Sequence, residues 1–221
     1  GVKINYAVQE KPEGIPQAFI IGKEFIKESN VTLILGDNLF HGNYLIDQLR
    51  RSFNLKKGAT IFAYPVIDPE RYGVVEFNSE GKALRIEEKP KNPKSKFAIT
   101  GLYFYDNTVV DKAETLKPSQ RGELEITDLN NLYMEENNLM VEKMNRGMTW
   151  LDTGTLDSLH EASAYIRTLE KRQGLKIGCP EEIAWRMGFI NEDKLNFLSK
   201  NLANSGYGDY LNSIVKERVN F

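Results

Sequence analysis

The sequence predicts an α/β fold: a Rossmann-like, mixed but mainly parallel sheet flanked by helices, followed by a C-terminal helical segment. Residues 31–35 form an apolar, β-rich run that stops at Gly36 and Asp37, which is typical of a buried strand in a parallel sheet. Such runs alternate with helical patterns early in the chain, and this alternation favours crossover connections over a sandwich. Beyond Gly178 only helical patterns remain.

The first elements follow in chain order. Residues 3–8 are expected to form a strand, and residues 17–28 a helix with its apolar side chains on one face. The strand at 31–35 comes next. A second helix is expected across residues 44–53, and then another strand at residues 59–66.

The middle of the chain changes character. Residues 73–77 and 82–88 flank a turn-forming segment and predict a hairpin. Residues 97–105 predict a long strand. A helix at 126–136 and a short strand at 139–144 complete this part of the sheet.

The C-terminal part is expected to be helical. Apolar residues at helical spacing between 156 and 169 predict a helix that Gly174 ends. We therefore expect an α/β domain over residues 1–174 and a helical segment over residues 175–221. Three further helices are expected, at residues 180–187, 191–201 and 207–219.

Composition excludes several classes of protein. The 221 residues are 41% hydrophobic and 27% charged, which is ordinary for a globular chain, and the net charge is -2. This balance gives no electrostatic footprint for a nucleic-acid polymer or an anionic membrane. The single cysteine, Cys179, excludes an intrachain disulfide and predicts a reducing, cytoplasmic location. No apolar run is long enough to span a membrane.

Two aspartates are candidate metal ligands. Asp37 directly follows a predicted strand, at the edge of an α/β sheet where ligands bind. Asp152 lies between Trp150 and Gly154. Magnesium is usually held by one or two carboxylates plus substrate phosphates, so the pair fits that ion. The alternative is that both aspartates only cap helices or form turns.

Five motifs in one order carry a family resemblance. The motifs are Tyr6-Ala7-Val8-Gln9, the strand 31–35 with Gly36-Asp37-Asn38, Tyr72-Gly73-Val74-Val75, Arg85-Ile86-Glu87-Glu88-Lys89-Pro90, and Thr149-Trp150-Leu151-Asp152-Thr153-Gly154-Thr155. In this order the chain resembles the nucleotide-sugar pyrophosphorylases, most of all their glucose-1-phosphate-using thymidylyltransferase branch. The resemblance continues through the segment Cys179-Pro180-Glu181-Glu182-Ile183-Ala184.

The resemblance implies an activity, a cofactor and partners. Enzymes of this branch form dTDP-glucose and pyrophosphate from dTTP and glucose 1-phosphate, with Mg²⁺, for deoxysugar synthesis such as that of dTDP-rhamnose. It also implies the nucleotide-diphospho-sugar transferase type of fold and a homotetramer. The alternative substrates are UTP or another sugar phosphate.

The catalytic residues implied by the resemblance are Asp37, Lys89 and Asp152, with the two aspartates as the metal-binding pair. The Lys89 ammonium would attract the phosphate of the incoming sugar, and Glu88 would accept hydrogen bonds from sugar hydroxyls. Arg121 matches a family arginine near the phosphates. The alternative for these charges is a solvated loop.

Further contacts are expected around the substrates. Tyr72, Gly73 and Ile99 would line the sugar pocket, as their family counterparts do. Base choice would belong to Gln9, whose amide can pair with a pyrimidine edge, and to Gly14, where the backbone can approach the base. Tyr6, Phe104 and Trp150 are interpreted as core residues.

A second nucleotide site is also implied by the resemblance. Gly42, Arg146, Glu182 and Arg186 match the family's regulatory pocket near a subunit interface. Spacing alone makes Glu182 and Arg186 an ordinary i,i+4 helix pair. His41 and His160 are interpreted as structural or solvent-facing.

Two other classes of protein were weighed. Similar Rossmann-like glycosyltransferases typically carry an Asp-x-Asp metal motif, whereas this chain has Asp37-Asn38-Leu39. The family's N-terminal glycine-rich phosphate loop has no counterpart in these 221 residues. We therefore expect this polypeptide alone to be inactive, and a non-catalytic binding or regulatory fragment is the alternative.

Overall fold

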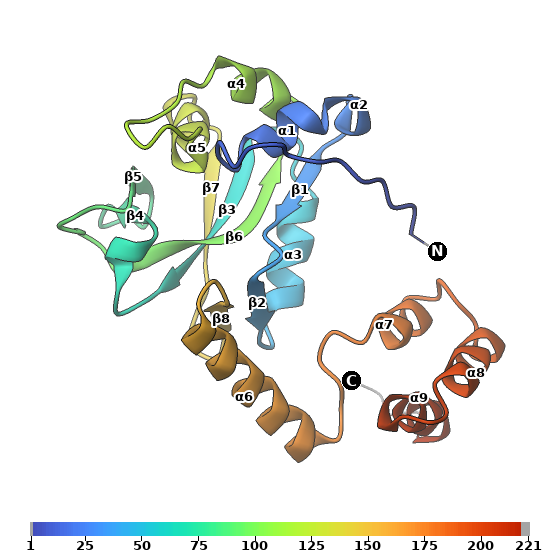
Figure 1. The fold of residues 1–221 in the computed structure, drawn as a ribbon. Coiled ribbons are helices and arrows are strands. Elements are labelled where there is room, and N and C mark those ends of the chain that lie inside the picture. The colour runs from blue at the N-terminus through green and yellow to red at the C-terminus, as the bar shows by residue number, and fades with distance from the viewer. Residues whose placement is uncertain (1, 218–221) are drawn as a thin grey trace. The chain divides into compact units, whose positions relative to one another are not determined.

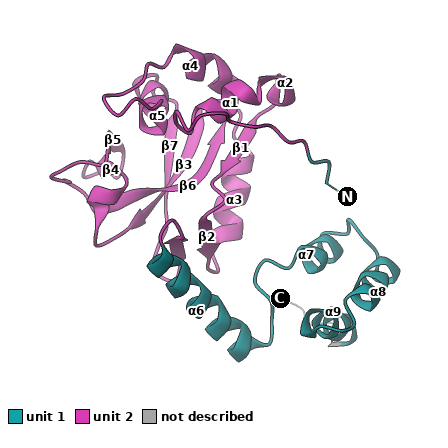
Figure 2. Ribbon diagram, viewed as in Figure 1, with its two compact units in different colours: residues 1–4, 156–221 teal, residues 5–155 magenta. Residues whose placement is uncertain are grey.

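The computed structural model describes residues 2–217 and divides the chain into two compact units. One unit comprises residues 5–155, and the other comprises residues 156–221 with residues 1–4 (Figure 2). This division lies before helix α6 (Leu156–Gln173), whereas the sequence placed the boundary after that helix. Within α6, Leu156 and Leu159 are exposed and Ala162 is buried, so its apolar spacing does not mark a fully packed face.

A six-stranded mixed sheet forms the centre of the first unit (Figure 1). Five strands are ordered β5-β4-β6-β3-β7, and a sixth, β1, pairs with β6. Their bounds are β1 Val31–Ile34, β3 Ala59–Pro65, β4 Gly73–Phe77, β5 Ala83–Glu88, β6 Phe97–Tyr105 and β7 Leu139–Lys143. The expected mixed sheet with flanking helices is confirmed.

The strand directions differ from the mainly parallel sheet that was expected. Among the described ladders of this sheet, β3–β7 is parallel, while the others are antiparallel. The reason is the position of β6, which inserts between β1 and β3 and runs against both. Local periodicity cannot reveal this insertion, because it depends on pairing between distant segments.

β3 pairs with β6 along the whole of one edge. The other edge of β6 is shared by two strands, β1 and β4. β1 pairs with residues 102–105 of β6, and β4 pairs with residues 97–98. The end of β1 and the start of β4 therefore face each other across residues 99–101. This break in the ladder is where the pocket described below opens.

Side-chain alternation along β6 builds two cores on opposite faces of the sheet. Ile99, Tyr103 and Tyr105 belong to one core, which packs against helices on that face. Those helices are α1 (Gln17–Ile21), α2 (Lys23–Ile26), α4 (Val109–Thr115) and α5 (Ile126–Glu135). Ala98 and Phe104 belong to the other core, beside helix α3 (Leu45–Phe53), so helices cover both faces (Figure 1).

A small two-stranded ladder adjoins this framework. β2 (Asn38–His41) pairs antiparallel with β8 (Thr149–Asp152), with Asn38 opposite Asp152. β2 and the short helix η1 (Pro69–Arg71) were not predicted from the sequence. This ladder joins the ends of two segments that are far apart along the chain.

Two expected N-terminal elements are wrong. Residues 3–8 form no strand in the described structure, and Tyr6 is 89% exposed, not in the core. The apolar alternation there finds no partner strand, and an unpaired strand has no ladder to stabilise it. The expected helix 17–28 is interrupted at Gly22, where α1 ends and α2 begins.

The second unit is helical, as expected. It contains α6, α7 (Pro180–Arg186), α8 (Glu192–Asn201) and α9 (Gly206–Glu217). Cys179, Leu195, Leu211 and Ile214 form its buried core. The last two residues of the expected helix 207–219 lie outside the described residues.

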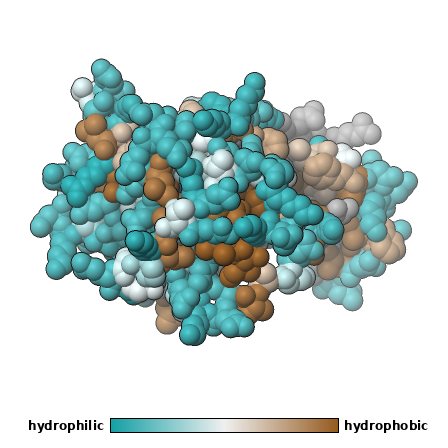
Figure 3. Space-filling model, turned by 90° about the horizontal axis from the view of Figure 1, so that it is seen from above, coloured by the Kyte–Doolittle hydropathy of each residue, from teal (hydrophilic) through white to brown (hydrophobic). Residues whose placement is uncertain are grey.

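The surface carries apolar side chains in separate groups among polar ones, as the face drawn in Figure 3 shows. In the second unit, Ile183, Met187 and Phe189 are more than half exposed. Among residues 2–217, no helix is both long and apolar enough to cross a membrane.

Candidate functional site

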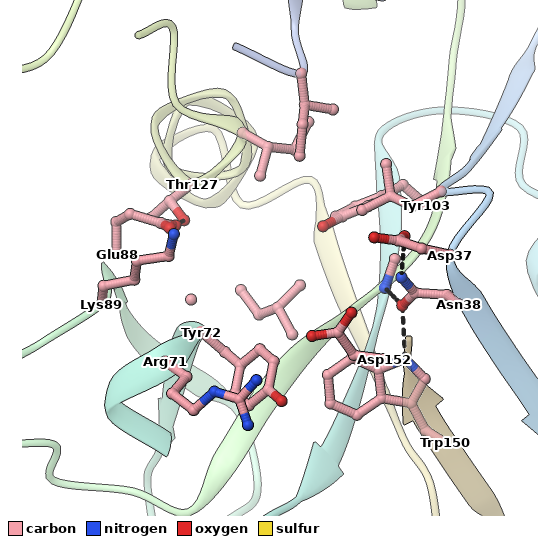
Figure 4. A pocket seen from close by; sticks show the side chains of 16 residues that line it. Asp37, Asn38, Arg71, Tyr72, Glu88, Lys89, Tyr103, Thr127, Trp150 and Asp152 are labelled. Atoms are coloured by element: carbon pink, nitrogen blue, oxygen red, sulfur yellow. Dashed lines mark hydrogen bonds between the residues drawn. The ribbon is translucent and has the colours of Figure 1, made fainter. Parts of the chain in front are cut away.

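A pocket of about 230 Å³ opens at the break between β1 and β4 (Figure 4). It lies wholly within the unit of residues 5–155. Its lining residues are Ile15, Leu35, Asp37, Asn38, Arg71, Tyr72, Gly73, Glu88, Lys89, Ile99, Gly101, Tyr103, Ile126, Thr127, Trp150 and Asp152. Seven residues expected in the site are therefore brought together: Asp37, Tyr72, Gly73, Glu88, Lys89, Ile99 and Asp152.

The two candidate metal ligands lie on one wall of the pocket. Asp152 ends β8, and Asp37 precedes β2, which is the strand paired with β8. Thr153 fixes the connection, because its backbone N–H and its hydroxyl both donate to the Asp37 carbonyl at 2.8 Å. The Asp152 carboxylate also accepts a hydrogen bond from the Gly154 N–H at 3.0 Å. Asp152 therefore stabilises a turn and also lines the pocket.

The carboxylates fit magnesium by their chemistry. Among the described residues, no group of three or more His, Cys, Asp or Glu side chains could hold a metal. A pair of carboxylates facing an open pocket suits an ion that completes its coordination with phosphate oxygens and water.

Asn38 is a site residue that the sequence reasoning missed. Its Oδ1 accepts from the Gly101 N–H at 2.9 Å and from the Trp150 indole at 2.6 Å, and its Nδ2 donates to Asp37 Oδ1 at 2.8 Å. The side chain thus joins β6, β8 and the candidate metal ligand. Gly101 is required there, because a Cβ would approach the Asn38 side chain to 2.6 Å.

The opposite wall carries Glu88 and Lys89 (Figure 4). Thr127 donates to Glu88 Oε2 at 2.5 Å, which orients the carboxylate at the end of β5. Lys89 has a φ of 40°, a left-handed conformation that is costly for a side chain of its size. Its backbone N–H donates to the Tyr72 carbonyl at 3.0 Å, and this bond helps to hold the strained turn.

Aromatic and small residues form the floor. The Tyr72 and Trp150 rings pack edge to face with centroids 5.1 Å apart. A Cβ on Gly73 would lie 3.1 Å from Thr127 Oγ1 and 3.2 Å from Glu88 Oε2, so glycine leaves room for these side chains. Burial raises the pKa of Tyr72, so its hydroxyl stays protonated at neutral pH. Trp150, predicted as a core residue, is buried and also lines the pocket.

Gln9 and Gly14 lie together outside the pocket lining. Gln9 Nε2 donates to the Gly14 carbonyl at 3.1 Å. Gly14 has a φ of 111°, and a Cβ there would lie 2.0 Å from the Leu124 carbonyl oxygen. The structure therefore provides a packing reason for this glycine, beside the expected approach to a base.

Arg121 contacts the site through Glu88 and does not line the pocket. Its Nη1 lies 3.7 Å from Glu88 Oε1 and 3.7 Å from Glu125 Oε1, and its Nη2 lies 3.3 Å from Glu123 Oε2. Arg121 thus sits within a group of carboxylates behind the Glu88 wall.

The residues expected in a regulatory site lie in different elements. Gly42 follows β2, and a Cβ there would lie 2.7 Å from the Gly147 carbonyl oxygen, next to Arg146 in the sequence. Glu182 and Arg186 lie on α7, where Arg186 Nε donates to Glu182 Oε1 at 2.8 Å. That pair has the expected i,i+4 geometry.

The comparisons with known proteins decide the family. The family model described as nucleotidyl transferase matches residues 1–168 of the chain. The chain belongs to the nucleotidyl transferase family. Within residues 1–168 this nucleotidyl transferase carries every lining residue of the pocket.

Curated relatives are similar over nearly the whole chain. A glucose-1-phosphate thymidylyltransferase from Mycolicibacterium smegmatis is 56% identical over 96% of this chain and 73% of its own length. One of the same name from Neisseria meningitidis is 52% identical over 98% of this chain and 75% of its own length.

Solved structures agree on the fold. A Bacillus anthracis protein assigned as a glucose-1-phosphate thymidylyltransferase, in complex with a sucrose, gives a TM-score of 0.67 at 42% identity, covering 75% of this chain and 65% of its own. A UDP-glucose pyrophosphorylase with UDP-glucose gives 0.63 at 22% identity, covering 74% and 66%, and shows the fold alone.

Proposed function

We propose that this chain carries the sugar-phosphate and metal sites of a glucose-1-phosphate thymidylyltransferase, the enzyme that forms dTDP-glucose and pyrophosphate from dTTP and glucose 1-phosphate. The observation that carries the proposal is the convergence of Asp37, Glu88, Lys89 and Asp152 on one pocket. It is supported by curated relatives of that name at 52–56% identity over at least 96% of the chain.

The reaction needs positioning and charge neutralisation more than covalent help. A phosphate oxygen of the sugar phosphate attacks the α-phosphorus of dTTP. The bond from that phosphorus to the bridging oxygen breaks, and pyrophosphate leaves with the electron pair. Both reactants are anionic, so the chain must supply positive charge and hold them in line.

Asp37 and Asp152 are proposed to hold Mg²⁺. When bound, the ion would neutralise phosphate charge and orient the nucleotide phosphates. Thr153 and Asn38 keep Asp37 in place, and the Gly154 N–H holds the carboxylate of Asp152, through the contacts described above.

The opposite wall is proposed to bind the sugar phosphate. Lys89 provides a compact positive charge for the phosphate. Glu88, already oriented by Thr127, accepts hydrogen bonds from sugar hydroxyls. Tyr72, Gly73 and Ile99 provide the apolar and backbone surface beneath the ring.

Base recognition by Gln9 and Gly14 stays part of the proposal. The two N–H groups of the Gln9 amide already donate to the Gly14 carbonyl and to Gln17 Oε1, so its carbonyl oxygen would meet the thymine edge. Arg121 is proposed to act near the phosphates through Glu88. The regulatory role expected of Gly42, Arg146, Glu182 and Arg186 stays a prediction, with the first two residues in one unit and the last two in the other.

We place this activity in the cytoplasm, because a lone, buried Cys179 suits a reducing compartment. A homotetramer is the proposed assembly.

The test is pyrophosphate release with Mg²⁺, glucose 1-phosphate and one nucleotide at a time. The protein assayed joins the family's N-terminal glycine-rich segment to this chain, because these 221 residues alone are expected to be inactive. We expect dTTP to be preferred, UTP to be used slowly, and ATP and GTP to be rejected. One methyl group separates thymine from uracil and is worth about 1–3 kcal/mol of discrimination. Gln9→Ala should weaken dTTP binding by about 1–3 kcal/mol, and a preference for ATP or GTP would overturn the thymidylyl assignment.

A further inference from the structure

Arg71 is a cation in the pocket to which the sequence analysis assigned no role. The charged residues that line the pocket are three carboxylates, two lysine or arginine cations and no others: Asp37, Glu88, Asp152, Arg71 and Lys89. Lys89 lies beside Glu88 on one wall, whereas Arg71 lies below Tyr72, toward Asp152 (Figure 4).

The backbone holds Arg71 in this position. Helix η1 begins at Pro69, which is buried, and the Tyr72 N–H donates to the Pro69 carbonyl at 3.1 Å. Tyr72 in turn packs against Trp150. Arg71 is therefore the last residue of a short helix, and the next residue, Tyr72, packs in the pocket floor.

The guanidinium is oriented by two contacts. Arg71 Nη1 donates to Asp68 Oδ2 at 2.8 Å, and the Arg71 Cζ lies 5.3 Å from the centre of the Tyr72 ring. Among the described contacts, those to protein oxygens use Nη1 and no other side-chain nitrogen of Arg71. The remaining N–H groups are available to a ligand.

The charge of Arg71 acts on the pocket. The hydrogen bond to Asp68 raises the pKa of Arg71, and electrostatic interactions with Tyr72 and Asp152 raise it further. No ion pair joins Arg71 to Asp152 within the described residues. The guanidinium thus lies near Asp152, a candidate metal ligand, but forms no ion pair with it.

The charges of the pocket and of the sugar phosphate favour a second cation in the pocket besides Lys89. A sugar phosphate is a dianion at neutral pH and would lie beside Glu88, which repels it. Lys89 offsets that repulsion with one charge inside the pocket, whereas Arg121 lies behind Glu88 and shares its charge with Glu123 and Glu125. A planar guanidinium presents a fork of donors that matches phosphate oxygens, and charge-assisted bonds of this kind are strong.

We propose that Arg71, which lines the pocket together with Lys89, binds the phosphate of the incoming sugar 1-phosphate. This inference rests on the proposed function. Asp68 is then a positioning residue, because it aims the guanidinium without touching the ligand. The two cations hold the phosphate between them, and this limits the directions from which its oxygen can attack.

The test compares Arg71→Gln and Arg71→Lys with Arg85→Gln. Arg85 is a matched control, because it lies outside the pocket lining and pairs with Glu87 at 3.1 Å with a similar exposure. Steady-state pyrophosphate release gives KM and kcat, and calorimetry gives the dissociation constants of glucose 1-phosphate and dTTP separately.

We expect Arg71→Gln to weaken glucose 1-phosphate binding about 10- to 100-fold and to leave the dTTP dissociation constant within about twofold of wild type. Arg71→Lys keeps the charge and loses the fork, so it should recover part of the affinity. Asp68→Asn should give a smaller loss in the same direction. Arg85→Gln should match wild type.

Unchanged glucose 1-phosphate affinity in Arg71→Gln, with wild-type turnover intact, would overturn the inference and leave the proposed function standing. An equal loss of dTTP and sugar-phosphate binding would also overturn it. If Arg71→Gln does not fold, as judged by circular dichroism, Arg71→Lys decides, because wild-type affinity in that variant contradicts a fork-shaped contact. Absence of turnover in the wild type, assayed with the family's N-terminal glycine-rich segment joined to it, would instead refute the proposed function.

Discussion

Asp37 and Asp152 reach one pocket wall from distant parts of the chain, and each is held by a short backbone contact. The Thr153 N–H and hydroxyl bind the carbonyl of Asp37, and the Gly154 N–H binds the carboxylate of Asp152. The carboxylates are therefore positioned before any ligand arrives. Preorganised charge of this kind is the main contribution that a chain makes to phosphoryl chemistry.

Replacing either aspartate should therefore slow catalysis without unfolding the protein. Asp37→Asn or Asp152→Asn removes one charge from the proposed metal site, and we expect a loss of about 10²–10⁴ in kcat. Pyrophosphate release measures the rate, and thermal melting checks the fold. Asp111→Asn, on the exposed face of α4, is the control. Full activity in both variants would contradict the metal assignment.

Lys89 combines a functional side chain with a strained backbone. Its φ of 40° is a region that glycine adopts freely and lysine does not. Such strain is often found at ligand sites, where the surrounding structure sustains it. The hydrogen bond from its N–H to the Tyr72 carbonyl is part of that support.

Two variants at this position should separate strain from charge. Lys89→Ala removes the ammonium and keeps the strain, so the KM for glucose 1-phosphate should rise while dTTP affinity stays nearly intact. Lys89→Gly should lose the same affinity but be more stable than Lys89→Ala by about 1 kcal/mol. Calorimetry and thermal melting measure the two effects. Collapse of dTTP binding alone would show that the role is misassigned.

Elements meet in this fold through buried polar side chains as well as through apolar cores. Asn38 ties β6 and β8 to the turn that bears Asp37. Asp106, at the end of β6, receives the Gly58 N–H at 2.6 Å and the Tyr133 hydroxyl at 3.0 Å. It thereby joins β3, β6 and α5, and together these residues organise the far end of the sheet.

Stability should depend on the ionisation of Asp106. Burial raises the pKa of this carboxyl, but hydrogen bonds from Thr108, Gly58 and Tyr133 outweigh burial and hold the pKa below its usual range. A depressed folded-state pKa contributes stability that is present above the unfolded pKa of about 3.9 and is lost as pH falls through the folded pKa.

Urea unfolding between pH 7 and pH 3 checks this expectation. The free energy of unfolding should fall as the solution is acidified below about pH 4. Asp106→Asn should lower stability at pH 7 by about 1–3 kcal/mol and flatten the acid dependence. Asp111→Asn serves again as the exposed control. An identical acid slope in wild type and Asp106→Asn would contradict the assignment.

At the scale of the whole molecule, the pocket lies in one unit and the exposed apolar side chains around α7 lie in the other. The α/β unit contains the complete pocket lining. The helical unit leaves Ile183, Met187 and Phe189 accessible on and just after α7. Grouped apolar side chains of this kind are typical of surfaces that contact another protein.

We expect this surface to contribute to the proposed tetramer. Light scattering should give roughly four times the chain mass of 25.3 kDa, and Phe189→Asp should lower the measured mass by placing a charge in the contact. Ile67→Asp, at a residue 99% exposed in the other unit, is the matched control. A constant mass of one chain at all protein concentrations would contradict the prediction.

Local sequence patterns were sufficient to predict most of the helices and strands and about half of the residues that line the pocket. Periodicity placed β3, the β4–β5 hairpin, β6 and α5 within one or two residues, because burial on a sheet face leaves a regular trace in the sequence. Carboxylates in short polar segments likewise pointed to Asp37 and Asp152, whereas the family resemblance implied Glu88 and Lys89. These features depend on short-range chemistry, which a linear sequence displays directly.

Long-range pairing decided the rest. The insertion of β6 between β1 and β3 made the sheet largely antiparallel, and it created the break in which the pocket opens. Asn38 and Arg71 carry no local signal, since one acts through partners on other strands and the other through a short proline-initiated turn. The energy of such contacts belongs to pairs of residues distant in sequence, so only the folded chain reveals them.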